Sequence, residues 1–308
     1  MASLRSKFWA KIISKEIGKA PEIKDTKDIR KDFSGDSRIL KANYWKKEKK
    51  IRYSNFNIDN LPALKLENKE IQSNKTLLYL HGGGYVACGP ETHGALITEL
   101  SLAAKTHVLF PIYRLAPEYP FPAAIEDALS SYKYLLKQGI DSEEIFIAGD
   151  SAGGGLTMAL LQKIKEENLP KPACAIVISP WTDLTLSGKS ITERKDRDPM
   201  IKMDPGSNVI VEAYCAGEDP KNPLISPIFA DLEDMPPIQI QVATEESIFD
   251  DSTRLFDRLK ECKNEEIDFI EWEGLFHVFQ AFCSGWLGIP EAKKSIKEMA
   301  NYSNRYIT

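Results

Sequence analysis

Ser151 lies at the centre of a glycine-rich stretch that is typical of a serine nucleophile. Residues 149–153 read Gly-Asp-Ser-Ala-Gly, a G-x-S-x-G pattern. The apolar run "IFIA" before it predicts a strand, and "LTMALL" after it predicts a helix. A sharp turn from strand to helix lifts the serine hydroxyl out at the carboxyl end of a sheet, and small neighbours let the backbone segments touch. The alternative is a glycine-rich helix start that serves only tight packing.

A serine hydroxyl becomes a good nucleophile only when a base removes its proton. Of the four histidines, His277 follows the last predicted strand, where a doubly wound sheet has its active edge. Its alternative is a core position among the aromatic residues of "EGLFHVFQAF". An acid must orient the imidazole, and the preceding predicted strand ends in Glu245 and Glu246. Asp250 and Asp251 compete with them but fall inside the next predicted helix. The order serine, acid, histidine is that of α/β-hydrolases.

Three consecutive glycines, Gly82, Gly83 and Gly84, follow the apolar run "TLLYL". Glycine carries an entropic cost of roughly 0.5–1 kcal/mol in regular structure, so the chain must gain something here. Acyl transfer forms an oxyanion that needs backbone N–H donors about 2.7–3.1 Å away. A bare glycine loop can supply them, with the amide of Ala152 as the natural partner. A phosphate cradle is the alternative, but no G-x-x-x-x-G-K-[ST] or G-x-G-x-x-G pattern follows.

Strands and helices alternate from residue 76 onward, which predicts a doubly wound, mostly parallel α/β sheet covered on both faces. A hairpin is expected within residues 49–68, and residues 181–225 break the rhythm as an insertion of short helices and loops. The expected strands are 76–80, 107–112, 144–150, 173–179, 236–244 and 267–272, and the expected helices include 121–139, 152–168, 250–262 and one from about 291.

The composition fits an ordinary globular protein of one large domain, with 43% hydrophobic and 28% charged residues in 308. A net charge of −5 offers no basic face for nucleic acid. Five cysteines without a CxxC pair favour free thiols and a cytoplasmic location. No run approaches the ~18 apolar residues of a membrane span, and the N-terminus does not resemble a signal peptide.

The first twenty residues predict an amphipathic helix, with Leu4, Phe8, Ile12 and Ile13 near one face. We expect this face to pack on the protein's own domain. The alternative is attachment to a membrane surface.

Several motifs together resemble the hormone-sensitive-lipase-like branch of the α/β-hydrolases, a family of bacterial carboxylesterases and lipases. They are "HGGGYV", "YRLAPEYPFPAAIEDA", "GDSAGGGL", "SPWTDL", "PPIQIQVATEESIFDDSTRL" and "EGLFHVF", in the family's order from about residue 50 onward. Within the family, the chain is nearest in look to alkyl-ester and monoterpene lactone hydrolases.

The resemblance implies a role for each motif residue. The family's nucleophile falls on Ser151 and its general base on His277. Its oxyanion amides fall on the glycine loop, most of all Gly82 and Gly83, together with Ala152. The histidine of "HGGG", residue 81, is expected to brace the loop and not to act as the base.

The family's acid is commonly an Asp in a D-P-L-x-D stretch, ten residues after the first Pro of "PP". Counting forward from Pro236 and back from Asp250 both give Glu246. This chain therefore departs from the common pattern, with Glu for Asp and Ser247-Ile248 for Pro-Leu. Glu245 stays open as the alternative acid.

The sequence thus predicts a serine carboxylesterase that hydrolyses short-to-medium acyl esters through an acyl-enzyme, without metal or cofactor. Residues 1–308 would form a single domain, with a cap made of about 1–45 and 181–225. Since the cap contains "ERKDRD", we expect acyl chains of about six carbons or fewer. A lactonase or amidase at the same site, or a ligand-binding protein without turnover, remains open. The expected partner is a small-molecule ester, and a homodimer is possible.

Overall fold

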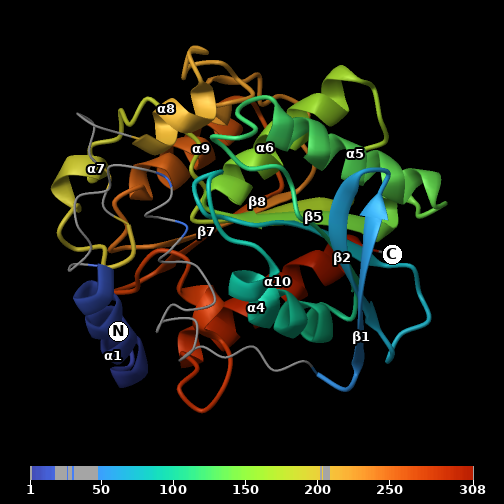
Figure 1. The fold of residues 1–308 in the computed structure, drawn as a ribbon, viewed down its shortest axis with the longest axis horizontal. Helices are drawn as coiled ribbons and strands as arrows, with labels where there is room; N and C mark the ends of the chain where they lie inside the picture. Colours follow the sequence, from blue (N-terminus) through green and yellow to red (C-terminus); the bar gives the residue numbers. More distant parts are fainter. Residues whose placement is uncertain are drawn as a thin grey trace.

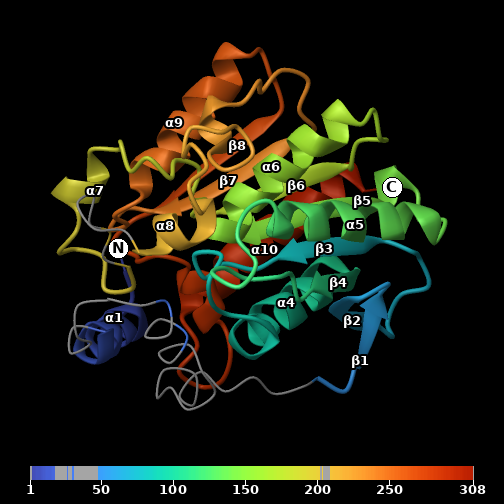
Figure 2. The same cartoon turned by 45° about the horizontal axis from the view of Figure 1, so that its top comes forward.

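An eight-stranded sheet runs through the computed structural model of this chain, which describes residues 2–17, 26, 30, 48–201, 203 and 209–307. The strand order is β1-β2-β4-β3-β5-β6-β7-β8 (Figures 1 and 2). β1 and β2 form an antiparallel hairpin, β2 runs antiparallel to β4, and all other neighbours are parallel. The strands are β1 Ile51–Ile58, β2 Leu61–Asn68, β3 Thr76–Leu80, β4 His107–Pro111, β5 Ile145–Asp150, β6 Cys174–Ile178, β7 Ile238–Ala243 and β8 Ile267–Trp272.

The central strands are apolar without alternation because both faces of the sheet are covered. Every residue of β3, β5, β6 and β7 is buried, whereas the edge strand β8 is mostly half-buried. Along β3, Leu78 and Leu80 enter one core cluster, and Leu77 and Tyr79 enter the other. This pattern confirms the predicted doubly wound sheet.

Helices form a layer on each side of the sheet (Figure 2). α5 (Ala123–Lys137), α6 (Ala152–Glu166) and α9 (Phe249–Glu261) bury their apolar residues in one core cluster. α4 (Pro90–Ala104) and α10 (Pro290–Tyr306) contribute to the cluster on the opposite face. The sheet therefore holds the carboxyl ends of its parallel strands at one edge, between the two helical layers.

The long connection between β6 and β7 interrupts the alternation, as predicted for residues 181–225. It contains α7 (Ser190–Glu193), α8 (Val209–Cys215) and a 3-10 helix at Pro227–Phe229. Two further 3-10 helices are Ser142–Glu144 and Phe279–Phe282. Residues 18–25, 27–29 and 31–47, which make up most of the N-terminal part of the predicted cap, lie outside the described residues.

The N-terminal helix α1 (Leu4–Ile17) forms as predicted but packs through a different face. Trp9 and Ile13 are almost completely buried, whereas Leu4 is 85% and Phe8 46% exposed. The prediction that Leu4 and Phe8 lie on the packed face is wrong, because the indole of Trp9 takes the packed side of the helix.

The five cysteines are free thiols, as the sequence predicts. Within the described part of the chain, no helix is long and apolar enough to cross a bilayer.

Candidate active site

Ser151 occupies a strained turn between β5 and α6. Its backbone has φ 55° and ψ −124°, a region that residues with a side chain rarely adopt. The two motif glycines permit this turn, since a Cβ on Gly149 would lie 2.2 Å from the carbonyl oxygen of Gly153, and one on Gly153 would lie 2.0 Å from that of Leu80. The sequence thus folds into the sharp strand-to-helix turn that a G-x-S-x-G motif requires.

His277 joins Ser151 to Glu246 in a continuous chain of hydrogen bonds. Its Nε2 lies 2.8 Å from the Oγ of Ser151, and its Nδ1 lies 2.8 Å from Oε2 of Glu246. A carboxylate at Nδ1 keeps the proton on that nitrogen, so Nε2 accepts from the serine hydroxyl. The three residues come from the carboxyl ends of β5, β7 and β8, which the parallel sheet brings to one edge.

The carboxylate of Glu246 is completely buried and held at a fixed orientation. Its Oε1 accepts hydrogen bonds from the hydroxyl of Ser179 and from the amide of Ala243, both at 2.6 Å. Oε2 is left for His277. The longer side chain of Glu, compared with the Asp of the common pattern, is therefore anchored at one oxygen while the other faces the imidazole.

Glu245 lies on the other side of the same loop. Its carboxylate forms an ion pair with Arg197 at 3.0 Å, and its side chain is 27% exposed. β7 ends at Ala243 and a turn follows, in which Glu245 faces Arg197 and Glu246 faces His277, so only one of the two glutamates contacts the imidazole.

The surroundings of His277 favour its protonated form. Burial lowers the pKa of this imidazole, but the hydrogen bond and the charge of Glu246 outweigh burial and raise it above 6.5. The negative charge of Asp198 adds to the rise. Asp198 is itself 1% exposed, and burial raises the pKa of its carboxyl to about 6. Its Oδ2 accepts from the amide of Ser247 at 3.3 Å, next to Glu246 in the chain.

The amides of the glycine loop are not equivalent. The amide of Gly82 donates to the carboxylate of Asp150 at 3.2 Å and is therefore engaged. Within the described residues, no acceptor faces the amides of Gly83 and Gly84. Ala152 is the first residue of α6, where an amide has no acceptor within its own helix. Of the four predicted oxyanion donors, Gly82 is thus the one whose amide already has an acceptor within the described residues.

The backbone conformation at position 83 requires a glycine. It has φ 109°, and a Cβ there would lie 2.2 Å from the carbonyl oxygen of Ala87. That carbonyl belongs to the same tight turn, because the amide of Ala87 donates to the oxygen of Gly83.

Asp150, the variable residue of the motif, anchors the glycine loop. Besides Gly82, its buried carboxylate accepts from the hydroxyl of Tyr79 at 2.8 Å and lies 3.1 Å from Nε2 of His93. Burial would raise the pKa of Asp150, but the charge and hydrogen bond of His93, with the hydrogen bond of Tyr79, lower it. The ionised carboxylate thus ties β3, α4 and the loop to the serine turn.

His81 braces the loop, as the resemblance implies. Its Nδ1 lies 2.7 Å from the oxygen of Gly82, and its ring stacks on Tyr113 at 4.2 Å between centroids. Burial lowers the pKa of His81 to about 3, so the ring is neutral at ordinary pH.

Helix α8 closes over the glycine loop. A Cβ on Gly84 would lie 3.0 Å from Cγ2 of Ile210. The ring of Tyr214 stacks on that of Tyr85, the residue after the glycines, with centroids 3.8 Å apart. Both tyrosines are buried, so an aromatic pair fills the space beside the loop.

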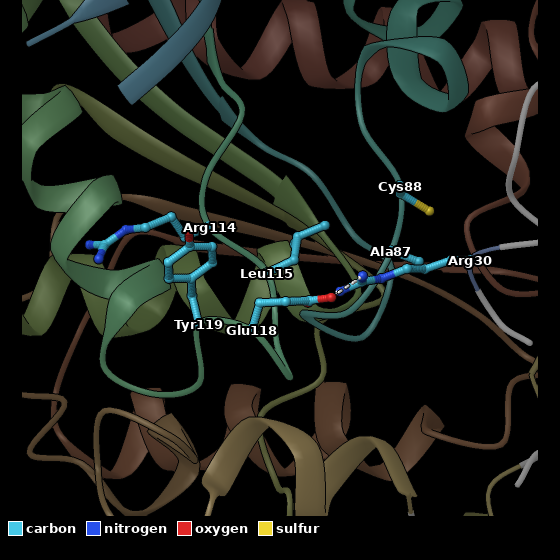
Figure 3. Close-up of a pocket in the computed structure, with 7 residues that line it drawn as sticks. All are labelled: Arg30, Ala87, Cys88, Arg114, Leu115, Glu118 and Tyr119. Carbon is cyan, nitrogen blue, oxygen red and sulfur yellow. Dashed lines mark hydrogen bonds and ion pairs between the residues drawn. The ribbon is translucent and has the colours of Figure 1, made fainter. Parts of the chain in front are cut away.

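A pocket of about 390 Å³ opens farther along the same loop, past the glycines (Figure 3). Ala87 and Cys88 line it, and an ion pair between Arg30 and Glu118 at 2.5 Å crosses it. Burial raises the pKa of the Cys88 thiol to about 12, so this cysteine is not a reactive thiolate.

Sequence reasoning missed the residues that hold the site together. Ser179, Asp198, Asp150 and His93 contact the predicted site residues or their neighbours. Asp150 and Ser179 stand inside recognisable motifs, "GDSAG" and "SPWTDL", and this position was the available signal. Nothing in the sequence singles out Asp198 from the charged run around it.

Comparison with known proteins defines the class of protein first. A model of the α/β hydrolase fold matches residues 77–281. An esterase of the bacterial hormone-sensitive lipase family has a TM-score of 0.91 at 32% identity, with both chains covered fully. A variant of the esterase E40 gives a TM-score of 0.91 at 31% identity and covers 99% of this chain and 100% of its own.

The relatives in sequence place the chain within that class. An acetyl-hydrolase of Streptomyces hygroscopicus is 42% identical over 73% of this chain and 74% of its own length. An esterase of Acinetobacter venetianus is 32% identical over 79% of this chain and 80% of its own. The chain belongs to the α/β hydrolase fold family, in its hormone-sensitive-lipase-like branch of bacterial carboxylesterases. It is a carboxylic ester hydrolase.

Proposed function

We propose that this enzyme hydrolyses short-to-medium acyl esters through a Ser-His-Glu triad. His277 takes the proton of Ser151 as its Oγ attacks the ester carbonyl. The amides of Gly83, Gly84 and Ala152 stabilise the oxyanion. His277 then protonates the leaving alcohol, and an acyl-Ser151 ester remains. Water, deprotonated by His277, attacks this ester. As the bond between the acyl carbon and Oγ breaks, His277 returns the proton to Oγ, and the carboxylic acid leaves. Glu246 stabilises the imidazolium in both steps.

One observation carries the proposal: the unbroken hydrogen-bond chain from Ser151 through His277 to Glu246, each link 2.8 Å long. It is supported by the amides of Gly83 and Gly84, for which the described part of the chain offers no acceptor. The similarity to an acetyl-hydrolase supports short acyl groups as substrates. We further propose that α8, with the rest of residues 181–225, caps the acyl site, and that the enzyme works in the cytoplasm.

A series of p-nitrophenyl esters from acetate to dodecanoate tests the reaction and its chain-length range. We expect butyrate to be turned over faster than dodecanoate. Ser151→Ala should lower kcat by more than about 10,000-fold. Thr157→Ser, a hydroxyl change on the same helix α6, is the control and should stay active.

A fluorophosphonate probe separates the outcomes. It should label the wild type and not Ser151→Ala. Undiminished turnover by Ser151→Ala would refute the proposed nucleophile. Labelling of Ser151 with turnover of lactones or anilides, but not of open-chain esters, would replace the proposed substrate with a lactone or an amide. A chain that neither turns over nor becomes labelled would act by binding alone.

A further inference from the structure

The outer face of α1 carries apolar and basic side chains together. Leu4, Phe8, Lys11 and Lys15 follow the spacing i, i+4, i+7 and i+11, which places them on one side of a helix. All four are exposed, Leu4 by 85% and Phe8 by 46%. Both figures of the whole fold place α1 at the periphery of the molecule (Figure 1).

The opposite side of α1 is firmly attached to the segment that follows His277. The indole Nε1 of Trp9 donates to the carbonyl of Leu287 at 3.0 Å, and its ring lies 4.8 Å from that of Phe282. The guanidinium of Arg5 donates to the carbonyl of Gly288 at 3.3 Å. The outer stripe is therefore carried by a helix that is docked on residues 282–288.

Trp286 extends the apolar surface beyond the helix. It precedes the residues that α1 holds, Leu287 and Gly288, and is 83% exposed. Leu4, Phe8 and Trp286 are thus large apolar side chains presented to solvent by two segments in contact. We call this group, with Lys7, Lys11 and Lys15, the α1 surface.

Charge indicates what the α1 surface contacts. Residues 4–17 contain four basic side chains and one acidic side chain, in a chain whose net charge is −5. A cationic helix on an acidic protein is complementary to an anionic surface. Aromatic and leucine side chains beside lysines suit the boundary between lipid head groups and acyl chains, where the apolar parts enter and the ammonium groups stay at the head groups.

We propose that the α1 surface docks the enzyme on anionic lipid membranes, with Leu4, Phe8 and Trp286 inserted and the three lysines over the head groups. This docking is independent of the proposed reaction, since it involves neither Ser151 nor His277. It would bring the enzyme to the boundary at which apolar esters accumulate.

Co-sedimentation with vesicles tests the proposal on the full chain without any ester. We expect binding to phosphatidylcholine vesicles that contain phosphatidylglycerol, weakened by added salt, and much weaker binding to phosphatidylcholine alone. The combined variant Leu4→Ser, Phe8→Ser and Trp286→Ser should bind at least about tenfold more weakly. Phe229→Ser, which changes an exposed aromatic residue elsewhere, should bind as the wild type does.

A second variant and control test the contribution of the lysines to vesicle binding. Replacing Lys7, Lys11 and Lys15 by Gln should weaken binding to the anionic vesicles on the order of tenfold or more. Replacing three exposed lysines in other loops and helix ends should not, and the three are Lys105, Lys137 and Lys263. The fluorescence of Trp286, taken as the difference between wild type and Trp286→Phe, should shift to the blue on binding.

Two results would overturn the proposal. One is binding that survives in the triple serine variant with its fold intact by circular dichroism. The other is a wild type that does not bind anionic vesicles but is a dimer by light scattering, while the triple serine variant is a monomer. In that case the occupant of the α1 surface is a second copy of this chain.

Discussion

Two adjacent glutamates at the end of β7 lie in opposite environments. Glu246 is fully buried, with one oxygen fixed by Ser179 and Ala243 and the other facing His277. Glu245 is partly exposed and paired with an arginine of the β6–β7 connection. A buried carboxylate can stabilise an imidazolium more strongly than an exposed one, because water screens the exposed charge.

Glu246→Gln should therefore lower kcat on a short ester by on the order of 100-fold or more. The amide can hold the fold, but it no longer stabilises the imidazolium and allows the wrong tautomer. The matched control is Glu245→Gln, which should keep most of its activity. Measurement of kcat for both variants, with circular dichroism for folding, checks the assignment. A crippled Glu245→Gln beside a near-normal Glu246→Gln would make Glu245 the acid.

Asp198 should tune the pH dependence of the same site. His277 must be neutral to act as a base, so activity should rise as pH rises through its pKa, which lies above 6.5. Removing the nearby charge in Asp198→Asn lowers the pKa of His277, and the acid limb of kcat/KM should move to lower pH. Asp196→Asn, an exposed neighbour, is the control. An acid limb that does not move would show that Asp198 has only a structural role.

At the scale of elements, α8 and the glycine loop share one aromatic contact. Tyr214 of α8 stacks on Tyr85 and meets Phe121 edge-on at 6.1 Å. The amide of Phe121 also donates to the carbonyl of Tyr214 at 2.8 Å. This cluster fixes α8 beside the amides proposed for the oxyanion, where the proposed acyl site would lie.

Removing the aromatic ring of Tyr214 should shift the enzyme's preference toward longer acyl chains. In Tyr214→Leu, the loss of the ring opens space beside the loop, and the ratio of kcat/KM for octanoate to that for butyrate should rise about tenfold. Tyr119→Leu, an exposed tyrosine, is the control. Steady-state kinetics on the two esters gives the ratio. If it stays at the wild-type value, the acyl chain runs elsewhere.

The sequence predicts these elements well because their signals are local. β8 begins and ends at the predicted residues, and α9 and α10 begin one residue earlier than expected. The packed face of α1 was not predictable in the same way, because Trp9 and Phe8 are both apolar and only the partner segment selects between them. The spacing of the motifs also selected Glu246 as the acid, and its carboxylate lies 2.8 Å from Nδ1 of His277. Motif spacing did not predict the supporting residues Ser179 and Asp198, because they contact the site from positions distant in the chain.

At the scale of the whole molecule, two buried carboxylates join the β6–β7 connection to α9. Asp251 accepts from the amides of Thr182 and Asp183, at 2.7 and 2.8 Å. Asp183 accepts from the guanidinium of Arg254 at 2.7 Å and from the hydroxyl of Ser187. Both aspartates are at most 1% exposed. The connection that carries α7 and α8 is thus tied to the main domain by two neighbouring buried carboxyl groups, those of Asp183 and Asp251.

The two carboxyls divide the charge between them. Burial and the charge of Asp183 raise the pKa of Asp251 to about 8. Burial opposes ionisation of Asp183 as well, but hydrogen bonds from Ser187, Thr185 and Arg254 lower its pKa. At neutral pH the folded protein therefore keeps a proton on Asp251 that the unfolded chain, with a pKa near 3.8, has lost.

This arrangement predicts an unusual pH dependence of stability. Between 3.8 and about 8 the folded state binds the extra proton, so the free energy of unfolding falls as pH rises. The slope approaches about 1.4 kcal/mol per pH unit for one proton. The pKa of His277 is also raised, so its contribution to the free energy of unfolding likewise falls as pH rises above 6.5. Asp251→Asn keeps an acceptor oxygen for both amides but cannot ionise, so its curve should be flatter. Urea unfolding across this range measures both curves, with Asp257→Asn, exposed on the same helix, as the control. Parallel curves for wild type and Asp251→Asn would mean that Asp251 is ionised in the folded protein.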